Sequence, residues 1–214
     1  MLDKSITYKN VIMRMEADKV KNIEDPVLPG NYRFRYFKDA DDIRHWGKIE
    51  TSVIEFDEEN TASDYFRNSY YPYLDELKKR CIFIVNESGL PVATSTAWFS
   101  DSELGHQANL HWVAVNPKYQ GQGLGRAVTQ KALTIFKEME PNNAVWLHTQ
   151  TWSYPAIKLY HDLGFNIVKT EKLANSNPRD MKKRIYPNDY EEAIPILKEV
   201  MKKDFIERLV NSAV

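Results

Sequence analysis

The stretch Gln120-Gly121-Gln122-Gly123-Leu124-Gly125-Arg126 contains three of the chain's eight glycines within five residues. A strand-like run at residues 110–115 ends before it at Asn116-Pro117, and an apolar stripe of helical spacing follows it through Met139. A glycine loop between a strand and a helix presents backbone N–H groups at the positive end of the helix dipole, where phosphate or pyrophosphate binds. A tight turn that needs positive φ would explain an isolated glycine cluster about as well.

The residues around these glycines exclude two common phosphate loops. The dinucleotide fingerprint requires Gly or Ala where Arg126 stands, and the P-loop requires Gly-Lys-Ser/Thr, which is absent. The pattern present is Gln/Arg-x-x-Gly-x-Gly/Ala, formed by Gln120, Gly123 and Gly125. This pattern alone is weak, since about 0.2 chance matches are expected in a chain of this length.

Two flanking motifs make the pattern specific. Leu110-His111-Trp112-Val113-Ala114-Val115-Asn116-Pro117 precedes the loop, and Ala156-Ile157-Lys158-Leu159-Tyr160-His161-Asp162-Leu163-Gly164-Phe165 follows it. This order resembles the acetyl-CoA motif of the GNAT superfamily of N-acetyltransferases, including its Ala-x-x-x-Tyr-x-x-x-Gly-Phe segment. The resemblance covers about residues 32–169 and is most specific over residues 110–165.

The resemblance implies an α/β fold with a mixed, predominantly antiparallel sheet whose central strands splay apart. The pantetheine arm of acetyl-CoA would lie in that wedge against the backbone of Val113 and Val115, and the glycine loop would hold the pyrophosphate. A strand that stops pairing leaves free N–H and C=O groups for an amide-rich ligand, which agrees with this implication. The cofactor-binding residues predicted in this way are Val113, Ala114, Val115, Gln120, Gly121, Gln122, Gly123, Leu124, Gly125, Arg126, Ser153 and Tyr160.

Two features depart from the family pattern. The family often has Asn where this chain has Ser153, which would make a weaker cofactor contact or none. The family also ends with a seventh strand, for which residues 183–186 are a poor candidate. A strand predicted within residues 6–15, or another chain, could take that place.

The remaining pattern predicts three parts: an N-terminal extension with a strand (residues 1–30), the GNAT-like domain (31–170), and a charged C-terminal extension with a helix at about 189–210 (171–214). Within the domain, periodicity predicts strands at 32–37, 81–85, 92–99, 110–115, 144–151 and 165–169. Helices are expected after Asp39, at 63–79 with a kink or split at Pro72, at 124–139 and at 155–163.

Transfer of an acetyl group from a thioester to an amine needs a base, a polarised carbonyl and a proton for the leaving thiolate. The motif makes Tyr160 the candidate proton donor. A tyrosine with a pKa near 10 is a weaker acid than a thiol near 8.5, so Tyr160 would assist in the transition state. A backbone N–H near Val113 would polarise the carbonyl. A tyrosine that only packs in the core is the alternative.

His111 is the candidate base. Strand alternation places Asn109, His111, Val113 and Val115 on one face, and Leu110, Trp112 and Ala114 on the other. The pattern Leu-His-x-x-Ala-Val resembles serotonin N-acetyltransferase, in which a histidine at this place helps remove the amine's proton. A base of this kind predicts a pH profile with a histidine-like pKa. A structural histidine is the alternative, with Glu55 or solvent then taking the proton.

An acidic stretch at residues 50–64 lies where the family builds its acceptor pocket, and Tyr65, Tyr70, Tyr71 and Tyr73 overlap or follow it. Acidic and aromatic side chains together suit a cationic amine. A solvated loop and a core-facing aromatic stripe explain the same residues.

Composition narrows the class of protein. The 214 residues carry a formal charge of −1, which gives no global basic field for nucleic acid or an anionic membrane. With Cys81 as the single cysteine and no long apolar run, we expect a cytoplasmic protein without a metal site. The leading prediction is an acetyl-CoA-dependent N-acetyltransferase of a primary amine, monomeric or homodimeric; a non-catalytic acyl-CoA-binding or regulatory module is the alternative.

Overall fold

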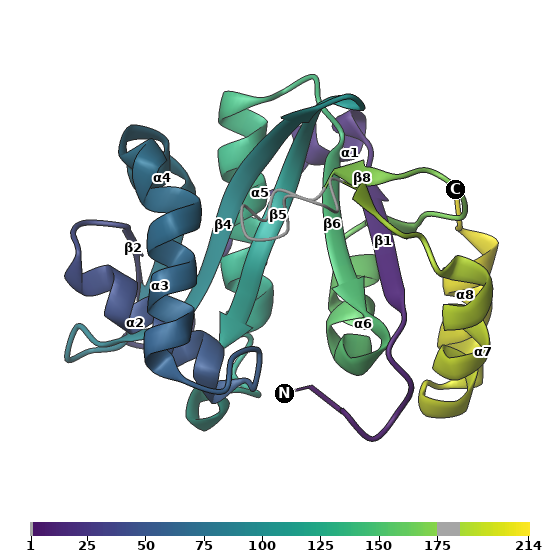
Figure 1. Cartoon of the computed structure of the whole chain (residues 1–214), viewed down its shortest axis with the longest axis horizontal. Helices are drawn as coiled ribbons and strands as arrows, with labels where there is room; N and C mark the ends of the chain where they lie inside the picture. Colours follow the sequence, from purple (N-terminus) through teal and green to yellow (C-terminus); the bar gives the residue numbers. More distant parts are fainter. Residues whose placement is uncertain (1, 175–184) are drawn as a thin grey trace.

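The computed structural model describes residues 2–174 and 185–214 and contains one large mixed sheet with helices on both faces (Figure 1). The strands are β1 (Asn10–Met15), β2 (Arg33–Tyr36), β3 (Cys81–Val85), β4 (Pro91–Ser102), β5 (Gly105–Val115), β6 (Val145–Gln150), β7 (Asn166–Ile167), β8 (Leu173–Ala174) and β9 (Ile185–Tyr186). The helices are α1 (Ala17–Lys21), α2 (Asp41–Ser52), α3 (Glu59–Tyr70), α4 (Leu74–Arg80), α5 (Leu124–Met139), α6 (Tyr154–Asp162), α7 (Tyr190–Val200) and α8 (Lys203–Asn211).

The large sheet has the order β2-β3-β4-β5-β6-β1-β7, and β5 and β6 are its one parallel pair of neighbours in the described residues. This confirms the predicted α/β class with a mostly antiparallel sheet. A hairpin of β8 and β9 forms a separate small sheet.

The N-terminal strand β1 lies inside the sheet, between β6 and β7. It pairs with β6 from Asn10↔Gln150 to Met15↔Val145, and with β7 through Met13↔Ile167. The N-terminal strand β1 therefore occupies the position in the sheet for which the sequence offered no good seventh strand. The other candidate, residues 183–186, falls partly outside the described residues, and its described part, β9, pairs with β8 instead.

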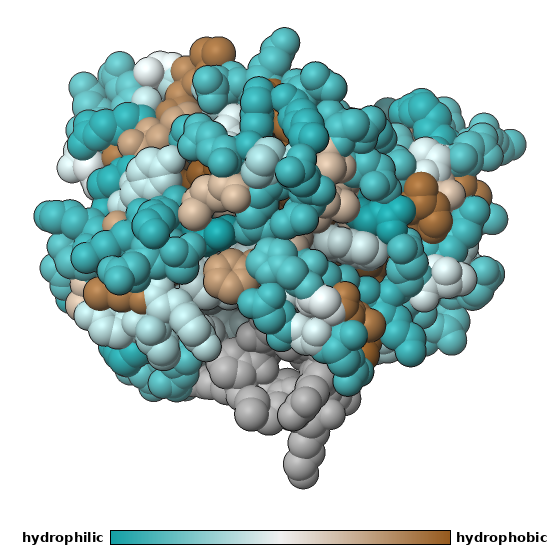
Figure 2. All heavy atoms as spheres, turned by 90° about the horizontal axis from the view of Figure 1, so that it is seen from above, coloured by the Kyte–Doolittle hydropathy of each residue, from teal (hydrophilic) through white to brown (hydrophobic). Residues whose placement is uncertain are grey.

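Two apolar cores lie on opposite faces of the sheet. Helix α5 packs on β3, β4 and β5 with the predicted stripe, of which Leu124, Val128, Ala132 and Ile135 are buried and Met139 is 37% exposed. Helices α2 and α3 cover the other face around Trp46 and Phe66. On the face seen in Figure 2 the surface is mostly hydrophilic, with hydrophobic side chains in small separate patches.

Two predicted helices are interrupted. The helix expected at residues 63–79 is split by a 3₁₀ turn, Tyr71–Tyr73, because Pro72 has no N–H to continue the helical ladder. The C-terminal helix divides at Met201, whose backbone is extended, into α7 and α8. Strand β5 begins at Gly105, five residues before the predicted start, because it completes a long hairpin with β4. Among the described residues no helix is long and apolar enough to cross a membrane.

Candidate active site

The strands β5 and β6 separate after a short parallel contact. They pair at Ala108↔Val145 and Asn109↔Trp146, and no register between them continues past that point (Figure 1). Backbone groups at the end of β5 are therefore available on the side that faces β6. The separation produces the wedge that the sequence predicts.

A cavity of about 360 Å³ opens at this wedge, between the end of β5, the glycine loop and the start of α6. Every predicted cofactor-binding residue lines it except Gln122 and Arg126. Gln122 accepts a hydrogen bond from the Tyr32 hydroxyl (3.0 Å), and Arg126 lies on the exposed side of α5. Ser153, where the family often has Asn, does line the cavity.

The glycine loop fits a phosphate group. Gly121 and Gly123 have φ of +76° and +80°, which a residue with a side chain adopts only with strain, and in the part of the chain that the structure describes no atom lies within 4 Å of a Cβ built on either. Helix α5 starts directly after Gly123, and among the described residues no side chain caps its first N–H groups. Uncapped N–H groups and the helix dipole favour an anion at this end.

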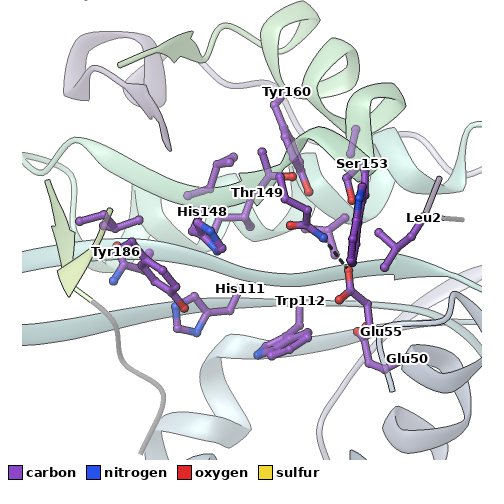
Figure 3. A pocket seen from close by; sticks show the side chains of 18 of the residues that line it. Leu2, Glu50, Glu55, His111, Trp112, His148, Thr149, Ser153, Tyr160 and Tyr186 are labelled. Atoms are coloured by element: carbon purple, nitrogen blue, oxygen red, sulfur yellow. Dashed lines mark hydrogen bonds between the residues drawn. The ribbon is translucent and has the colours of Figure 1, made fainter. Parts of the chain in front are cut away.

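A second cavity, of about 300 Å³, meets the first at a shared wall. The residues common to both linings are Leu2, Glu55, Val113, Ser153, Ala156 and Tyr160. Figure 3 shows the Tyr160 side chain directed between the strands, opposite Trp112. Tyr160 is 7% exposed, and burial, with the charges of Glu55 and Glu50 adding to it, raises the pKa of its hydroxyl. The hydroxyl therefore stays protonated across the neutral range.

A β-bulge in β5 changes which side chains share a face. Thr94 pairs with Ala114 but Thr96 pairs with His111, so Trp112 and Val113 stand opposite a single residue of β4. Trp112 has a φ of +51°, which is unusual for a bulky residue.

The bulge overturns the predicted alternation. Leu110 and Val113 face the core under α5, whereas Trp112 packs against Trp46 on the α2 side. His111, bonded to the buried Tyr70 of that same side, does not share a face with Val113 and Val115. Strand parity was wrong here because it assumes an unbroken ladder.

His111 belongs to a group of rings at one end of the second cavity, which we call the histidine end: His111, Tyr70, His148 and Tyr186. The Nδ1 of His111 lies 2.8 Å from the Tyr70 hydroxyl, and His148 stacks on Tyr186 with ring centroids 3.9 Å apart. Burial, together with the nearby His148, lowers the pKa of His111 to about 3, and burial lowers that of His148 to about 4. Both imidazoles are neutral at physiological pH.

Two carboxylates mark the opposite end, the carboxylate end: Glu50 from α2 and Glu55 from the turn that follows it (Figure 3). The N–H of Glu55 donates to the carbonyl of Glu50 (3.2 Å), and Ile54 between them has a φ of +70°. Glu50 is 1% exposed, and its Oε1 has no hydrogen-bond partner among the described residues. Burial raises the pKa of both carboxyl groups, and the charge of Glu55 raises that of Glu50 further.

The rest of the acidic and aromatic stretch divides between site and surface. Asp57, Glu58, Glu59 and Asp64 are exposed and line neither cavity. Tyr65 lines the second cavity, Tyr70 reaches His111, and Tyr71 and Tyr73 are exposed.

Several lining residues were missed by sequence reasoning. Leu2, Lys4 and Tyr8 come from the N-terminal segment, which is held against Trp152 through the bond from the Asp3 N–H to the Trp152 carbonyl (2.9 Å). His148 also lines the second cavity, and the sequence motifs do not include it. The available signal was that His148 stands two residues from both Trp146 and Gln150, which puts all three on the same, half-buried face of β6.

The other reactive side chains lie apart from the two cavities. Cys81 is buried and its thiol pKa is raised to about 12 by burial. His106 bonds to Asp101 (2.7 Å) and Glu140 (3.0 Å). In the described part of the chain, no group of three or more His, Cys, Asp or Glu side chains is arranged to hold a metal ion.

Comparison with known proteins gives a family and a fold. The profile of the Acetyltransferase (GNAT) family matches residues 41–165. A mycothiol acetyltransferase of Rothia mucilaginosa is 25% identical over 190 residues, which cover 78% of this chain and 51% of that protein. The ribosomal protein bS18 alanine N-acetyltransferase of Escherichia coli is 40% identical over 62 residues, covering 28% of this chain and 40% of that protein. The chain thus spans about half the length of the mycothiol acetyltransferase.

Solved structures agree on the fold. A GCN5-related N-acetyltransferase from Sphaerobacter thermophilus superposes with a TM-score of 0.57 at 17% identity, over 76% of this chain and 49% of that one. A GNAT-family acetyltransferase from Colwellia psychrerythraea gives 0.55 at 16% identity, over 75% and 54%. With the family profile matched across the glycine loop, the wedge and the helix of Tyr160, this chain belongs to the acetyltransferase (GNAT) family.

Proposed function

We propose that the protein transfers the acetyl group of acetyl-CoA to a primary amine by direct attack while both substrates are bound. The observation that carries this proposal is the position of Tyr160 in the wall shared by the two cavities. One cavity has the glycine loop that suits a pyrophosphate, and the other has the carboxylates and rings that suit an amine. A group between them is placed to act where the two substrates meet.

The chain supplies three functions to this reaction. The glycine loop and the first turn of α5 bind the phosphates, and acetyl-CoA brings the thioester carbonyl that is attacked. The bulge at Trp112 and Val113 frees a backbone N–H to polarise that carbonyl. Tyr160, kept protonated by burial, donates to the departing sulfur.

We infer that the acceptor enters as a cation. Glu50 and Glu55 lie in the second cavity beside the rings of Tyr65 and Trp112, whose centroids are 5.1 Å apart. Carboxylates and aromatic faces both attract an ammonium group, and they do so more strongly where water is scarce. Lys4 is a further charged group in the lining, and its ammonium lies 5.6 Å from the centroid of the Trp152 ring.

Thiol release from acetyl-CoA, measured over a panel of amines, tests the proposal. The panel contains aliphatic mono- and diamines, arylethylamines, and peptides with free α-amino or lysine amines. Acetyl-CoA-dependent release with at least one amine, and an acetylated product by mass spectrometry, is the expected result. Binding of acetyl-CoA with no release across the panel would favour the alternative, a non-catalytic acyl-CoA-binding module.

A further inference from the structure

We propose that Glu55 is the catalytic base that takes the proton of the acceptor amine. This inference rests on the proposed acetyl transfer and names the group that completes it. Glu55 is the one carboxylate in the described residues that lines both cavities, together with Tyr160, whereas Glu50 lines the acceptor cavity alone.

The backbone around Glu55 is built at a conformational cost. Ile54, a β-branched residue, holds a φ of +70°, a conformation that a residue of this kind adopts only with strain. The turn returns the Glu55 N–H to the carbonyl of Glu50 and so keeps the two residues close together. Ile54 and Trp112 are the two non-glycine residues with positive φ in the described chain, and both adjoin the site.

The environment of Glu55 suits a base. Its carboxylate accepts a long bond from the Gln150 amide (3.3 Å), so most of its hydrogen-bonding capacity is left for a ligand. Burial raises its pKa, which brings it closer to that of an ammonium group and improves proton transfer. The charged or titratable groups around it are Glu50 on α2, Tyr160 on α6, and Lys4 and Tyr8 on the N-terminal segment.

His111 is less well placed for the same work. Its Nδ1 is engaged with the Tyr70 hydroxyl at 2.8 Å, and it lines the acceptor cavity but not the cofactor cavity. A base must reach the nitrogen that attacks the acyl carbon, and that attack takes place where the cavities join. The geometry therefore points to Glu55 for the proton and leaves His111 at the acceptor's far end.

The proton balance is complete with these groups. The ammonium gives one proton to Glu55, and the neutral nitrogen forms the N–C bond as the C–S bond breaks. The electron pair of that bond goes to sulfur, which takes the proton of Tyr160. Once the N–C bond has formed, the nitrogen loses its second proton to the Tyr160 phenolate, which restores the hydroxyl. Glu55 releases the first proton to solvent.

The test compares Glu55→Gln with Glu58→Gln, an exposed carboxylate of the same acidic stretch that lines neither cavity. With the panel amine of highest kcat/KM, Glu55→Gln should lower kcat/KM at pH 7.5 by about 10²-fold. Glu58→Gln should keep the parent rate. Calorimetry with acetyl-CoA should give all three proteins similar affinity, which shows that the Glu55→Gln protein is folded.

The pH profile gives the sharper readout. In the parent, kcat/KM should reach a plateau below the pKa of the amine, since Glu55 removes the proton. In Glu55→Gln it should rise about tenfold per pH unit up to that pKa, because only the amine already neutral in solution reacts. Calorimetry with the same amine and no acetyl-CoA should show weaker amine binding to Glu55→Gln than to the parent. Glu55→Asp should restore part of the amine affinity and part of the plateau in the pH profile.

Two results separate the possible failures. If Glu55→Gln keeps the rate of the parent and the plateau in kcat/KM against pH, Glu55 is not the base. If His111→Gln shows the rising pH profile instead, the acetyl transfer stands and His111 is the base. If the parent binds acetyl-CoA but acetylates no amine of the panel, the proposed function fails, and the assignment of Glu55 fails with it.

Discussion

The two ends of the acceptor cavity are both lined by buried and half-buried titratable groups, but they differ in how the hydrogen-bonding capacity of those groups is satisfied. At the histidine end, His111 bonds to Tyr70 (2.8 Å), and His148 bonds to Asn10 (2.8 Å) and stacks on Tyr186. At the carboxylate end, Glu50 Oε1 has no partner among the described residues and Glu55 has the long bond to Gln150. A satisfied network stabilises a fold, whereas an unsatisfied buried carboxylate indicates a place for a ligand.

The two ends also have opposite effects on stability as pH changes. A buried histidine with a lowered pKa binds fewer protons than in the unfolded chain, so its contribution is lost as the pH falls below about 6.5. A buried carboxyl group with a raised pKa binds more protons than in the unfolded chain, so its contribution is lost as the pH rises above about 4.5.

The largest effect is expected at Tyr160. Tyr160→Phe should lower kcat by about 10²-fold or more while the affinity for acetyl-CoA changes little, because the lost contact acts in the transition state. Tyr154→Phe, on the same helix but outside both cavities, is the matched control. Steady-state kinetics under conditions where chemistry limits the rate would measure it. Equal kcat for Tyr160→Phe and the parent would make Tyr160 a core residue.

Cofactor binding should respond to a substitution of Gly125, the second residue of α5. A Cβ there would contact Leu159 and Val115 at 3.7 Å, an ordinary distance, so Gly125→Ala should keep the fold. Because the residue lines the cofactor cavity, we expect calorimetry to show about tenfold weaker acetyl-CoA binding, equal to ~1.4 kcal/mol.

Gly105→Ala is the control for this prediction. Gly105 has a φ of +83° and lies away from the cavity, so its alanine variant should lose stability and keep the affinity for acetyl-CoA. Unchanged affinity in Gly125→Ala would remove this end of α5 from the cofactor site.

Glu50→Gln should sharpen the difference between the two ends. Between pH 4.5 and the raised pKa of the buried carboxyl group, the free energy of unfolding of the parent falls by up to about 1.4 kcal/mol for each pH unit because of this group. The amide of Glu50→Gln does not titrate, so it adds no such dependence on pH. Chemical denaturation at pH 5 and pH 8 should therefore show the variant gaining stability over the parent as the pH rises. A constant difference would mean that Glu50 is not desolvated in solution.

The smallest effect is expected at Ile54. Ile54→Gly removes the strain at φ +70° and should raise the free energy of unfolding by about 1 kcal/mol. Because the turn then becomes less restricted, kcat should fall while the acetyl-CoA affinity is kept. Thermal denaturation and kinetics on one preparation would measure both, and a loss of stability would show that the Ile54 side chain contributes more by packing than it costs in strain.

The sequence predicted the cofactor side of the site better than the acceptor side. The glycine loop, the end of β5 and the first turns of α6 lie within one stretch, and their spacing follows from regular strands and helices. The acceptor cavity combines Leu2, Glu55, His148 and Tyr186, which are far apart in the chain. Only the strand order, with β1 inside the sheet, and the hairpin of β8 and β9 bring them together.

The wrong prediction of the face on which His111 lies had a single cause. The bulge in β5 puts His111 and Trp112 on the same face, so His111 is out of phase with Val113 and Val115, and no turn residue in that run indicates a bulge. Strand alternation placed His111 on the face of Val113 and Val115, and the predicted base role assumed the ordinary pKa of an imidazole. Burial, which one strand's sequence does not reveal, instead lowers that pKa to about 3.

The most direct test of this account is the ratio of kcat/KM between Glu55→Gln and His111→Gln, measured at pH 7.5 with the same amine and saturating acetyl-CoA. If the chemistry takes place at the carboxylate end, Glu55→Gln should be slower than His111→Gln by about tenfold or more, since general-base catalysis contributes 10²-fold or more. A His111→Gln protein slower than Glu55→Gln would contradict the account and place the proton transfer at the histidine end.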